Sequence, residues 1–276
     1  MKKAGTISEY IRHRGLLVSF VARDIKGRYT GSVLGMMWSL VQPLVMLALY
    51  TVVFSILLKV TFPAPRGGSG STADAAIFIC CAILPWIAIQ ESLQRAAGSL
   101  VENANLIKKV AFPSAVVPLH LVIGGAINQI PGTVLLVVVV AIVYGVVPAT
   151  LVLLPVVWVL QIAFTAGLGW MLASFNVYFR DVRHIVAVGM LIWMFLTPIF
   201  YPAAAVEANA NIPGWLKTLY AINPMKLIVD LYRNAIYLQV WPQWWEILLL
   251  TGYAVVAVVV GHAIFIRNRD QFADLL

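Results

Sequence analysis

The sequence of residues 110–179 is VAFPSAVVPLHLVIGGAINQIPGTVLLVVVVAIVYGVVPATLVLLPVVWVLQIAFTAGLGWMLASFNVYF, and it contains no Asp, Glu, Lys or Arg. A helix that crosses the hydrocarbon core of a membrane needs about 20 mostly apolar residues. This stretch is too long for one such helix and long enough for two, and Tyr144-Gly145-Val146-Val147-Pro148 provides turn residues between them. We therefore predict two membrane spans, at 116–143 and 150–174.

The composition of the whole chain indicates the same class of protein. Hydrophobic residues make up 62% of its 276 residues and charged residues 11%, whereas about 25% of the residues of a soluble domain are charged. The 19 basic and 11 acidic side chains are too few to form the polar shell of a soluble core of this size. The composition therefore predicts an integral membrane protein and excludes a soluble domain or a disordered chain.

Four further stretches have few or no charged residues and are long enough to form spans. They lie at 34–58, 76–100, 185–200 and 247–266, and we expect Pro198 and Pro202 to end the third of these. Together with the two spans above, they predict an all-α integral membrane protein that forms a single domain over residues 1–276, with six transmembrane helices.

An even number of spans places both termini on one side of the membrane, and the basic residues indicate which side. Five of the 19 fall on the opposite side, namely Lys59, Arg66, Lys217, Lys226 and Arg233, and the other 14 fall on the side of the termini. Because cytoplasmic loops carry the excess of Lys and Arg, we expect both termini to be cytoplasmic. The net charge of +8 is then explained by topology and gives no reason to expect a nucleic-acid partner.

Residues 7–30 mix apolar and basic side chains. Apolar residues recur at three- and four-residue steps from Ile7 to Ile25, and Arg23, Lys26 and Arg28 are among the basic residues of the segment. This pattern is typical of a helix that lies in the membrane surface, with its basic side chains towards the lipid phosphates. A solvated basic leader that only fixes the orientation of the chain remains the alternative.

The cytoplasmic loop at 102–113 is short and amphipathic, and it ends in a proline. Leu106, Ile107 and Phe112 are too apolar for an exposed loop of this length, so we expect something to cover them. The groove of a partner protein would do so. Packing against the spans of this chain or against the lipid surface is the alternative.

Residues 201–240 are too polar to form a span and too apolar to form an ordinary outer loop. Pro202, Pro213 and Trp215 are among the residues that interrupt the segment. We expect short helices that dip into the outer leaflet or lie on it, because irregular backbone at membrane depth must be shielded by protein or water. The stretch at 225–238 is expected to be a surface helix.

The sequence contains no set of residues arranged for catalysis or metal binding. Its four His residues are scattered, with no Cys or carboxylate at metal-ligand spacing. The glycine-rich stretch at 67–71 lacks the lysine of a phosphate-binding loop. We therefore expect a protein that is not an enzyme and that holds no cofactor or metal of its own.

The predicted spans are nearly free of ionisable residues, which an ion-driven carrier normally places near the middle of its helices. Glu91 and Arg95 are the exception. Spaced i,i+4, they share one face of a helix and can neutralise each other, although a role in passing substrate or relaying movement stays open. An exporter without ion-coupling residues and without an ATP site would need an ATPase supplied by another chain.

Several stretches of the chain resemble one family of transporters. They are residues 23–44 (RDIKGRYTGSVLGMMWSLVQPL), 103–113 (NANLIKKVAFP), 178–184 (YFRDVRH) with 197–202 (TPIFYP), and Asn223-Pro224-Met225. These stretches are similar to the ABC-2 permeases that export polysaccharides, and most similar to the permease subunits of O-antigen and teichoic acid exporters. The similarity covers nearly the whole chain in order.

The resemblance implies an assembly in the bacterial inner membrane. In such permeases two copies form a channel, and each copy recruits an ATP-binding subunit, with or without a glycan-binding domain, which binds the ATP and Mg. Residues 7–30 match the interface helix and 201–222 the outer re-entrant pair. Residues 102–113 match the coupling helix that sits in an ATPase groove, and its coupling residues would be Asn105, Leu106, Ile107, Lys108, Lys109 and Phe112.

The resemblance also implies a substrate, an undecaprenyl-linked polysaccharide. In the family the first and fifth spans line the channel, where aromatic rings can stack on sugars. The candidates here are Trp38, Tyr50, Phe54, Trp193, Phe195, Phe200 and Tyr201, although each could instead face lipid or the core. Lys26 and Arg28 would meet the charged lipid end of the substrate, and Arg23 belongs with them to the interface helix that faces lipid headgroups. A teichoic acid exporter, a drug or lipid exporter of the same fold, and a membrane anchor without transport activity are the alternatives.

Overall fold

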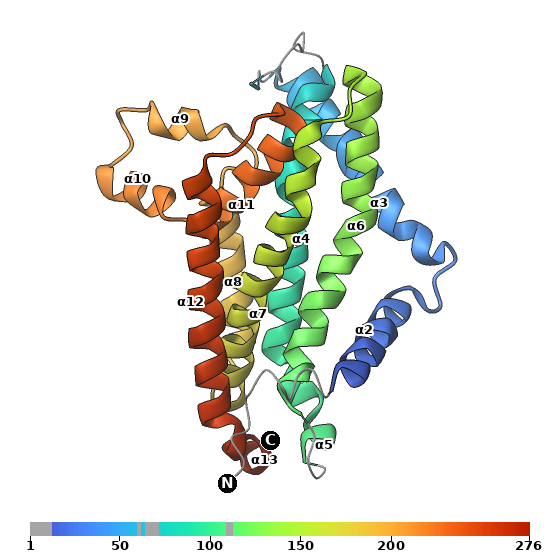
Figure 1. Cartoon of the computed structure of the whole chain (residues 1–276), viewed down its shortest axis with the longest axis vertical. Helices are drawn as coiled ribbons and strands as arrows, with labels where there is room; N and C mark the ends of the chain where they lie inside the picture. Colours follow the sequence, from blue (N-terminus) through green and yellow to red (C-terminus); the bar gives the residue numbers. More distant parts are fainter. Residues whose placement is uncertain (1–12, 60–61, 64–71, 109–112) are drawn as a thin grey trace.

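The computed structural model describes residues 13–59, 62–63, 72–108 and 113–276, and every regular element among them is a helix. Five helices are long and apolar enough to cross a membrane (Figure 1). They are Trp38–Leu57, Ala73–Glu102, Val116–Tyr144, Ala149–Tyr178 and Trp244–Leu275. Five of the six predicted spans coincide with them, so the all-helical membrane class is confirmed.

These long helices are built from several consecutive elements. The first consists of α3 (Trp38–Tyr50) and the π-helix η2 (Thr51–Leu57), and the next two are α4 (Thr72–Glu102) and α6 (Val116–Tyr144). The fourth consists of η3 (Ala149–Leu153) and α7 (Leu154–Tyr178), and the last of α12 (Trp244–Asn268), η5 (Arg269–Gln271) and α13 (Phe272–Leu275). The shorter elements are α2 (Arg14–Tyr29), η1 (Gly35–Met37), α5 (Ala104–Ile107), α8 (Val182–Phe195), α9 (Ala203–Glu207), α10 (Gly214–Ala221), α11 (Pro224–Arg233) and η4 (Asn234–Leu238).

The span expected at 185–200 corresponds to α8, which is shorter than the others. Its 14 residues extend over about 21 Å at 1.5 Å per residue, less than the roughly 30 Å of a hydrocarbon core. The helix ends just before Thr197 and Pro198, where a proline was expected to stop it. By itself, α8 is therefore too short to cross the hydrocarbon core.

Helix α4 is the centre of the bundle. It packs against α6, α7, α8 and α11, and Ile77, Ile79, Trp86 and Ile89 along it have no exposed surface. In contrast, Pro43 is the only buried residue of α3 and η2. Figure 1 shows α3 at the edge of the bundle. Its apolar surface is therefore left for lipid or for another protein chain.

Helices α7 and α12 approach each other closely because two glycines face each other. A Cβ atom on Gly261 would lie 1.9 Å from the carbonyl oxygen of Gly167, and one on Gly167 would lie 2.2 Å from the carbonyl carbon of Ala257. Small residues at such contacts are a usual basis of helix association in membranes, where burial of apolar surface gives no driving force. The two helices therefore form a tightly packed pair.

The turn predicted at 144–148 joins α6 to η3. Gly145 ends α6 with a φ of +69°, and its N–H donates to the carbonyl oxygen of Ala141 at 2.9 Å. A left-handed residue at the end of a helix is favourable for glycine, which has no Cβ to clash. The turn prediction is thus confirmed, with the physical reason that the sequence suggested.

The expectation of a surface helix over 225–238 is wrong. Seven of the ten residues of α11 are buried, among them Ile228, Tyr232 and Arg233, because the helix is inserted against α4, α7 and α12. The charged residues that suggested exposure pair with one another, Lys226 with Asp230 at 3.2 Å and Arg233 with Asp230 at 3.9 Å. The short helices α9 and α10 extend away from the bundle, at the opposite end from α5 and α13 (Figure 1).

Candidate functional site

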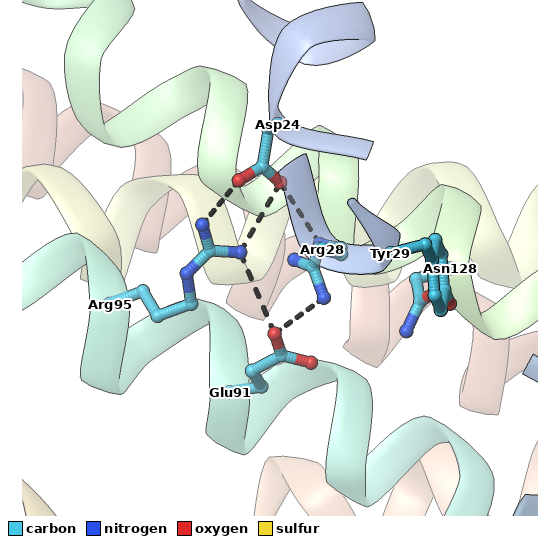
Figure 2. A network of polar contacts seen from close by, with 6 residues as sticks. All are labelled: Asp24, Arg28, Tyr29, Glu91, Arg95 and Asn128. Atoms are coloured by element: carbon cyan, nitrogen blue, oxygen red, sulfur yellow. Dashed lines mark hydrogen bonds and ion pairs between the residues drawn. The ribbon is translucent and has the colours of Figure 1, made fainter. Parts of the chain in front are cut away.

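Four charged side chains meet where the side chains of α2 reach the C-terminal half of α4. Figure 2 shows Asp24 and Arg28 of α2 facing Glu91 and Arg95 of α4. Arg28 Nε lies 3.1 Å from Asp24 Oδ2, and Arg28 Nη1 lies 2.5 Å from Glu91 Oε1. Arg95 contacts both carboxylate oxygens of Asp24 and lies 3.5 Å from Glu91 Oε1. We call these four residues the inner charge network.

The network follows from the same spacing on two helices. Asp24 and Arg28 are i,i+4 on α2, and Glu91 and Arg95 are i,i+4 on α4, so each pair occupies one face of its helix. When the two faces meet, each arginine contacts the carboxylate of the other helix as well as its own. The ion pair predicted between Glu91 and Arg95 is present, and the structure adds α2 as its partner.

The carboxylate of Asp24 keeps its negative charge at physiological pH. The side chain of Asp24 is 7% exposed. Burial alone would raise its pKa, but the hydrogen bonds and positive charges of Arg95 and Arg28 outweigh burial and lower the pKa below its ordinary value of 3.8. The carboxylate therefore keeps its charge, and stabilises the docked α2, until the pH falls below that value.

Helix α2 is also fixed to α6. The Tyr29 hydroxyl donates to Asn128 Oδ1 (Figure 2), and the ring of Phe20 meets His120 edge-on with centroids 5.2 Å apart. A Cβ atom on Gly124 would lie 2.6 Å from Asp24 Oδ2, so the absence of a side chain at Gly124 lets the two helices approach. The helix predicted as an interface helix is thus docked on two long helices.

The basic residues predicted to meet lipid differ in their surroundings. Lys26 is exposed, and the exposed Arg23 places its guanidinium over the ring of Phe20, 4.5 Å from the centroid. Arg28 is 12% exposed and is held by two carboxylates. A cleft of about 430 Å³ opens beside Arg23, Arg28 and His120. Residues 7–12 of the predicted interface helix lie outside the described residues.

The predicted coupling loop contains the short helix α5. Asn105 and Lys108 are exposed, whereas Leu106 and Ile107 are partly buried. Ile107 packs against a buried cluster that includes Phe265 and Phe272. The described part of the loop is therefore covered in part by its own chain, while its polar residues stay accessible. Lys109 and Phe112 lie outside the described residues.

Three of the predicted channel aromatics come together beside the end of α8. The rings of Phe54 and Phe200 are stacked at 6.1 Å, and Tyr50 meets Phe200 edge-on at 6.1 Å. The others are dispersed. Trp193 packs inside the bundle against Trp86, and the Tyr201 hydroxyl donates to the carbonyl oxygen of Phe195. The side chains of Trp38 and Phe195 are exposed.

Two residues that join α11 to the end of α8 were not recognised from the sequence as positioning residues. Asn223 caps α11 by accepting a hydrogen bond from the N–H of Met225 at 2.9 Å, and it also accepts from Trp193 Nε1 at 2.8 Å. Its amide nitrogen donates to the carbonyl oxygen of Leu196 and to Thr197 Oγ1, both at 3.1 Å. The Asn-Pro sequence signals a helix start, but the contact with the end of α8 has no local signal.

Arg233 is the second such residue. Its guanidinium is buried, donates to the carbonyl oxygens of Phe78 at 3.3 Å and Ile199 at 3.0 Å, and lies over the ring of Phe78, 3.6 Å from the centroid. Arg233 thereby joins α11, α4 and the segment after α8. An arginine that satisfies carbonyls of distant segments cannot be recognised from its sequence neighbours.

Taken together, a bundle of long apolar helices, the helix α2 docked on it and the short loop helix α5 are features of a multi-pass membrane protein. Residues 16–237 match the model of the ABC-2 type transporter family, and the chain belongs to that family. It is 30% identical over 269 residues to the O-antigen export system permease protein RfbA of Myxococcus xanthus. The matched region covers 97% of this chain and 98% of that protein.

Two Klebsiella pneumoniae proteins of the same name are each 28% identical to it over 267 residues, covering 95% of both chains. The resemblance to polysaccharide-export permeases that the sequence suggested is therefore confirmed. The family consists of permease subunits, which are not themselves catalytic.

Proposed function

We propose that this chain is the transmembrane permease subunit of an ABC transporter that exports a lipid-linked O-antigen polysaccharide across the bacterial inner membrane, driven by a separate ATPase subunit. The names of its relatives support the substrate class. The positions of the charged side chains in the long helices support ATP, and not an ion gradient, as the energy source. In α3–η2, α4, α6, α7 and α12, the charged side chains away from the helix ends are Glu91 and Arg95, and both are engaged by α2. That arrangement suits a path without ion coupling.

The proposed assembly contains two copies of this permease and two ATP-binding subunits, and ATP and Mg would bind to the partner ATPases. Both termini would be cytoplasmic, with α8 and the residues after it completing a sixth crossing. The apolar surface that α3 leaves uncovered and the exposed Ile185, Val188, Ile192 and Phe195 of α8 support a contact between the two copies. A spacing of three or four residues puts these α8 side chains on one face.

Movement would reach the spans from the ATPases through two elements. Helix α2, bound to α4 by the inner charge network, would act as the interface helix, and the loop at 102–113 would act as the coupling helix. The exposed Asn105 and Lys108 are available for an ATPase groove, and Leu106, Ile107, Lys109 and Phe112 complete the proposed coupling set.

The substrate path would be neutral and lined with aromatic rings. Tyr50, Phe54 and Phe200 form its best-supported part because their rings already cluster, and Trp38, Trp193, Phe195 and Tyr201 remain candidates. Sugar rings present apolar faces that can slide over such side chains. The undecaprenyl pyrophosphate end would be met at the inner interface by the exposed Arg23 and Lys26, while Arg28 would hold α2 in place.

Deletion of the gene for this chain in its native cells tests the proposal. We expect loss of polysaccharide from the cell surface and accumulation of the lipid-linked polymer inside, with both defects reversed by the intact gene. The measurements are surface glycan by gel and immunoblot, and lipid-linked glycan by mass spectrometry. Accumulation of a lipid-linked teichoic acid would show that teichoic acid, and not O-antigen, is the substrate. Normal surface glycan with loss of drug or lipid export would contradict the proposal.

A further inference from the structure

The C-terminal segment after α12 folds under the inner end of the bundle and contacts the coupling loop. Phe272 has no exposed surface, and its ring meets that of Phe265 edge-on with centroids 5.2 Å apart. Ile107 of α5 and the C-terminal Leu276 pack against the same buried cluster. Helices α13 and α5, which are far apart in the sequence, are therefore neighbours in the structure.

The same segment is attached to α7. The hydroxyl of Tyr178, at the end of α7, donates to Gln271 Oε1 at 2.6 Å. Val177 and Trp170 of α7 belong to the buried cluster, and Trp170 Nε1 donates to the carbonyl oxygen of Ala115 at 2.9 Å. Side chains of α7 and of the C-terminal segment thus contact Ile107 of α5 and the backbone at Ala115.

A contact of this kind decides where α5 lies. The helix has only four residues, and a single helical turn is not stable by itself because nucleation fixes several residues for one hydrogen bond. Its position is therefore set by what it packs against. Ile107 packs against the buried cluster that contains Phe272, and α5 contacts α13, while Asn105 and Lys108 are exposed. The apolar side chain anchors the helix and leaves the polar ones available.

We propose that residues 269–276 hold α5 in the position in which it engages the ATPase, and that Phe272 is the positioning residue of this contact. A displacement of α5 then acts on α7 and α12 as well as on α4, to which α5 is joined in sequence. Because α7 and α12 are packed together at Gly167 and Gly261, they respond as a pair. This inference rests on the proposed function and adds a route by which movement enters the bundle.

The first test needs no ATPase. Ile107→Cys and, as the exposed reference, Asn105→Cys are labelled with a membrane-impermeant maleimide in inverted membrane vesicles. The native Cys80 and Cys81 are 1% and 0% exposed, so they contribute little labelling. Each cysteine is examined in the otherwise unchanged chain and together with Phe272→Ala, Phe272→Leu or Leu275→Ala. Leu275 is the matched control because it lies on the same helix and is 48% exposed.

We expect Phe272→Ala to raise the labelling rate at position 107 by about tenfold or more, because loss of the buried ring frees α5 to open locally. Phe272→Leu, which keeps most of the apolar volume, should restore protection, and Leu275→Ala should change nothing. Position 105 should label fast in every chain. An unchanged rate at position 107 in Phe272→Ala would overturn the inference, whatever the chain transports.

The second test measures coupling in membranes that contain the full complex. We expect Phe272→Ala to lower the glycan exported per ATP hydrolysed by about tenfold, within the range seen for residues that link two sites, while the ATPase stays bound. If Phe272→Ala raises the labelling of α5 but leaves the glycan exported per ATP hydrolysed unchanged, the contact has no role in coupling and that part of the inference is overturned. If the unsubstituted chain exports no glycan with its ATPase, the proposed function fails, and the labelling still decides whether the segment holds α5.

Discussion

At the residue scale, the inner charge network explains why a chain with so few charges keeps two acids and two arginines together. A charge removed from water is costly unless it is paired, and Asp24 and Arg28 are largely buried, at 7% and 12% exposure. Two positive and two negative side chains cancel, so the network can lie between α2 and α4 without a net charge. The network fixes the orientation of α2, because displacing α2 would separate buried charges from their partners.

The network predicts a strong effect of Asp24→Asn. The substitution leaves Arg28 and Arg95 to share Glu91, and loss of charged hydrogen bonds of this kind costs about 2–3 kcal/mol. We expect a melting temperature several degrees lower in detergent. Lys26→Gln, an exposed change on the same helix, serves as the control and should leave the melting temperature unchanged.

A double-mutant cycle separates the pair from its surroundings. Because Asp24 and Arg95 are in direct contact, the combined Asp24→Asn and Arg95→Gln should cost clearly less than the sum of the two single changes. Additive effects would mean that the two side chains act independently. The lowered pKa of Asp24 also predicts that its contribution is present above pH 3.8 and is lost only as the pH falls further.

The sequence predicted half of this network. Glu91 and Arg95 stand out because they interrupt an otherwise uncharged stretch, and their i,i+4 spacing indicates a pair. Asp24 and Arg28 have the same spacing, but they lie in a segment rich in basic residues where any of them could face lipid. Which helix α2 meets is decided by tertiary packing at Gly124 and Phe20, and no local pattern contains that information.

At the element scale, α11 is the helix whose place the sequence misjudged. Lys226, Asp230 and Arg233 suggest a solvated face, yet they pair with one another while the apolar face of α11 enters the bundle. Its apolar residues were visible in the sequence. The depth at which the helix sits depends on Asn223 and Arg233 holding it to α4 and the end of α8, which are contacts over long sequence distances.

We expect Asn223→Ala to loosen this half of the molecule. It removes the cap of α11 and leaves Trp193 Nε1 and the carbonyl of Leu196 without their partner, at a cost of about 2–3 kcal/mol. Asn209→Ala, an exposed loop change that removes one local hydrogen bond, is the matched control. Limited proteolysis of detergent-solubilised protein should cut Asn223→Ala faster between α8 and α12, and equal rates would contradict the assignment.

At the scale of the whole molecule, the gaps between charged residues were enough to locate the long helices. They were enough because a membrane imposes one length and one composition on every crossing. The same rule overestimated the segment at 185–200, where the helix stops at Phe195. It also could not show that α4 is central and α3 peripheral, since both are apolar enough to cross a membrane but differ greatly in burial.

The energy source proposed for export, a partner ATPase, lies outside this chain. Glu91 and Arg95, the charged side chains away from the ends of the long helices, are paired, and the apolar faces of α3 and α8 are uncovered. Both features suit a neutral path between two copies that is opened by partner ATPases. A carrier driven by an ion gradient would instead need an ionisable side chain free to gain and lose its ion within the spans.

Transport into sealed inverted vesicles tests whether a partner ATPase drives export. Vesicles containing this chain and its ATPase subunit are given lipid-linked O-antigen, and protection of the glycan from an added glycosidase is measured with ATP, with a non-hydrolysable analogue, and with a proton gradient alone. We expect the glycan to be protected only when this chain, the ATPase and ATP hydrolysis are all present. Protection driven by the proton gradient without ATP, or by this chain without the ATPase, would contradict it.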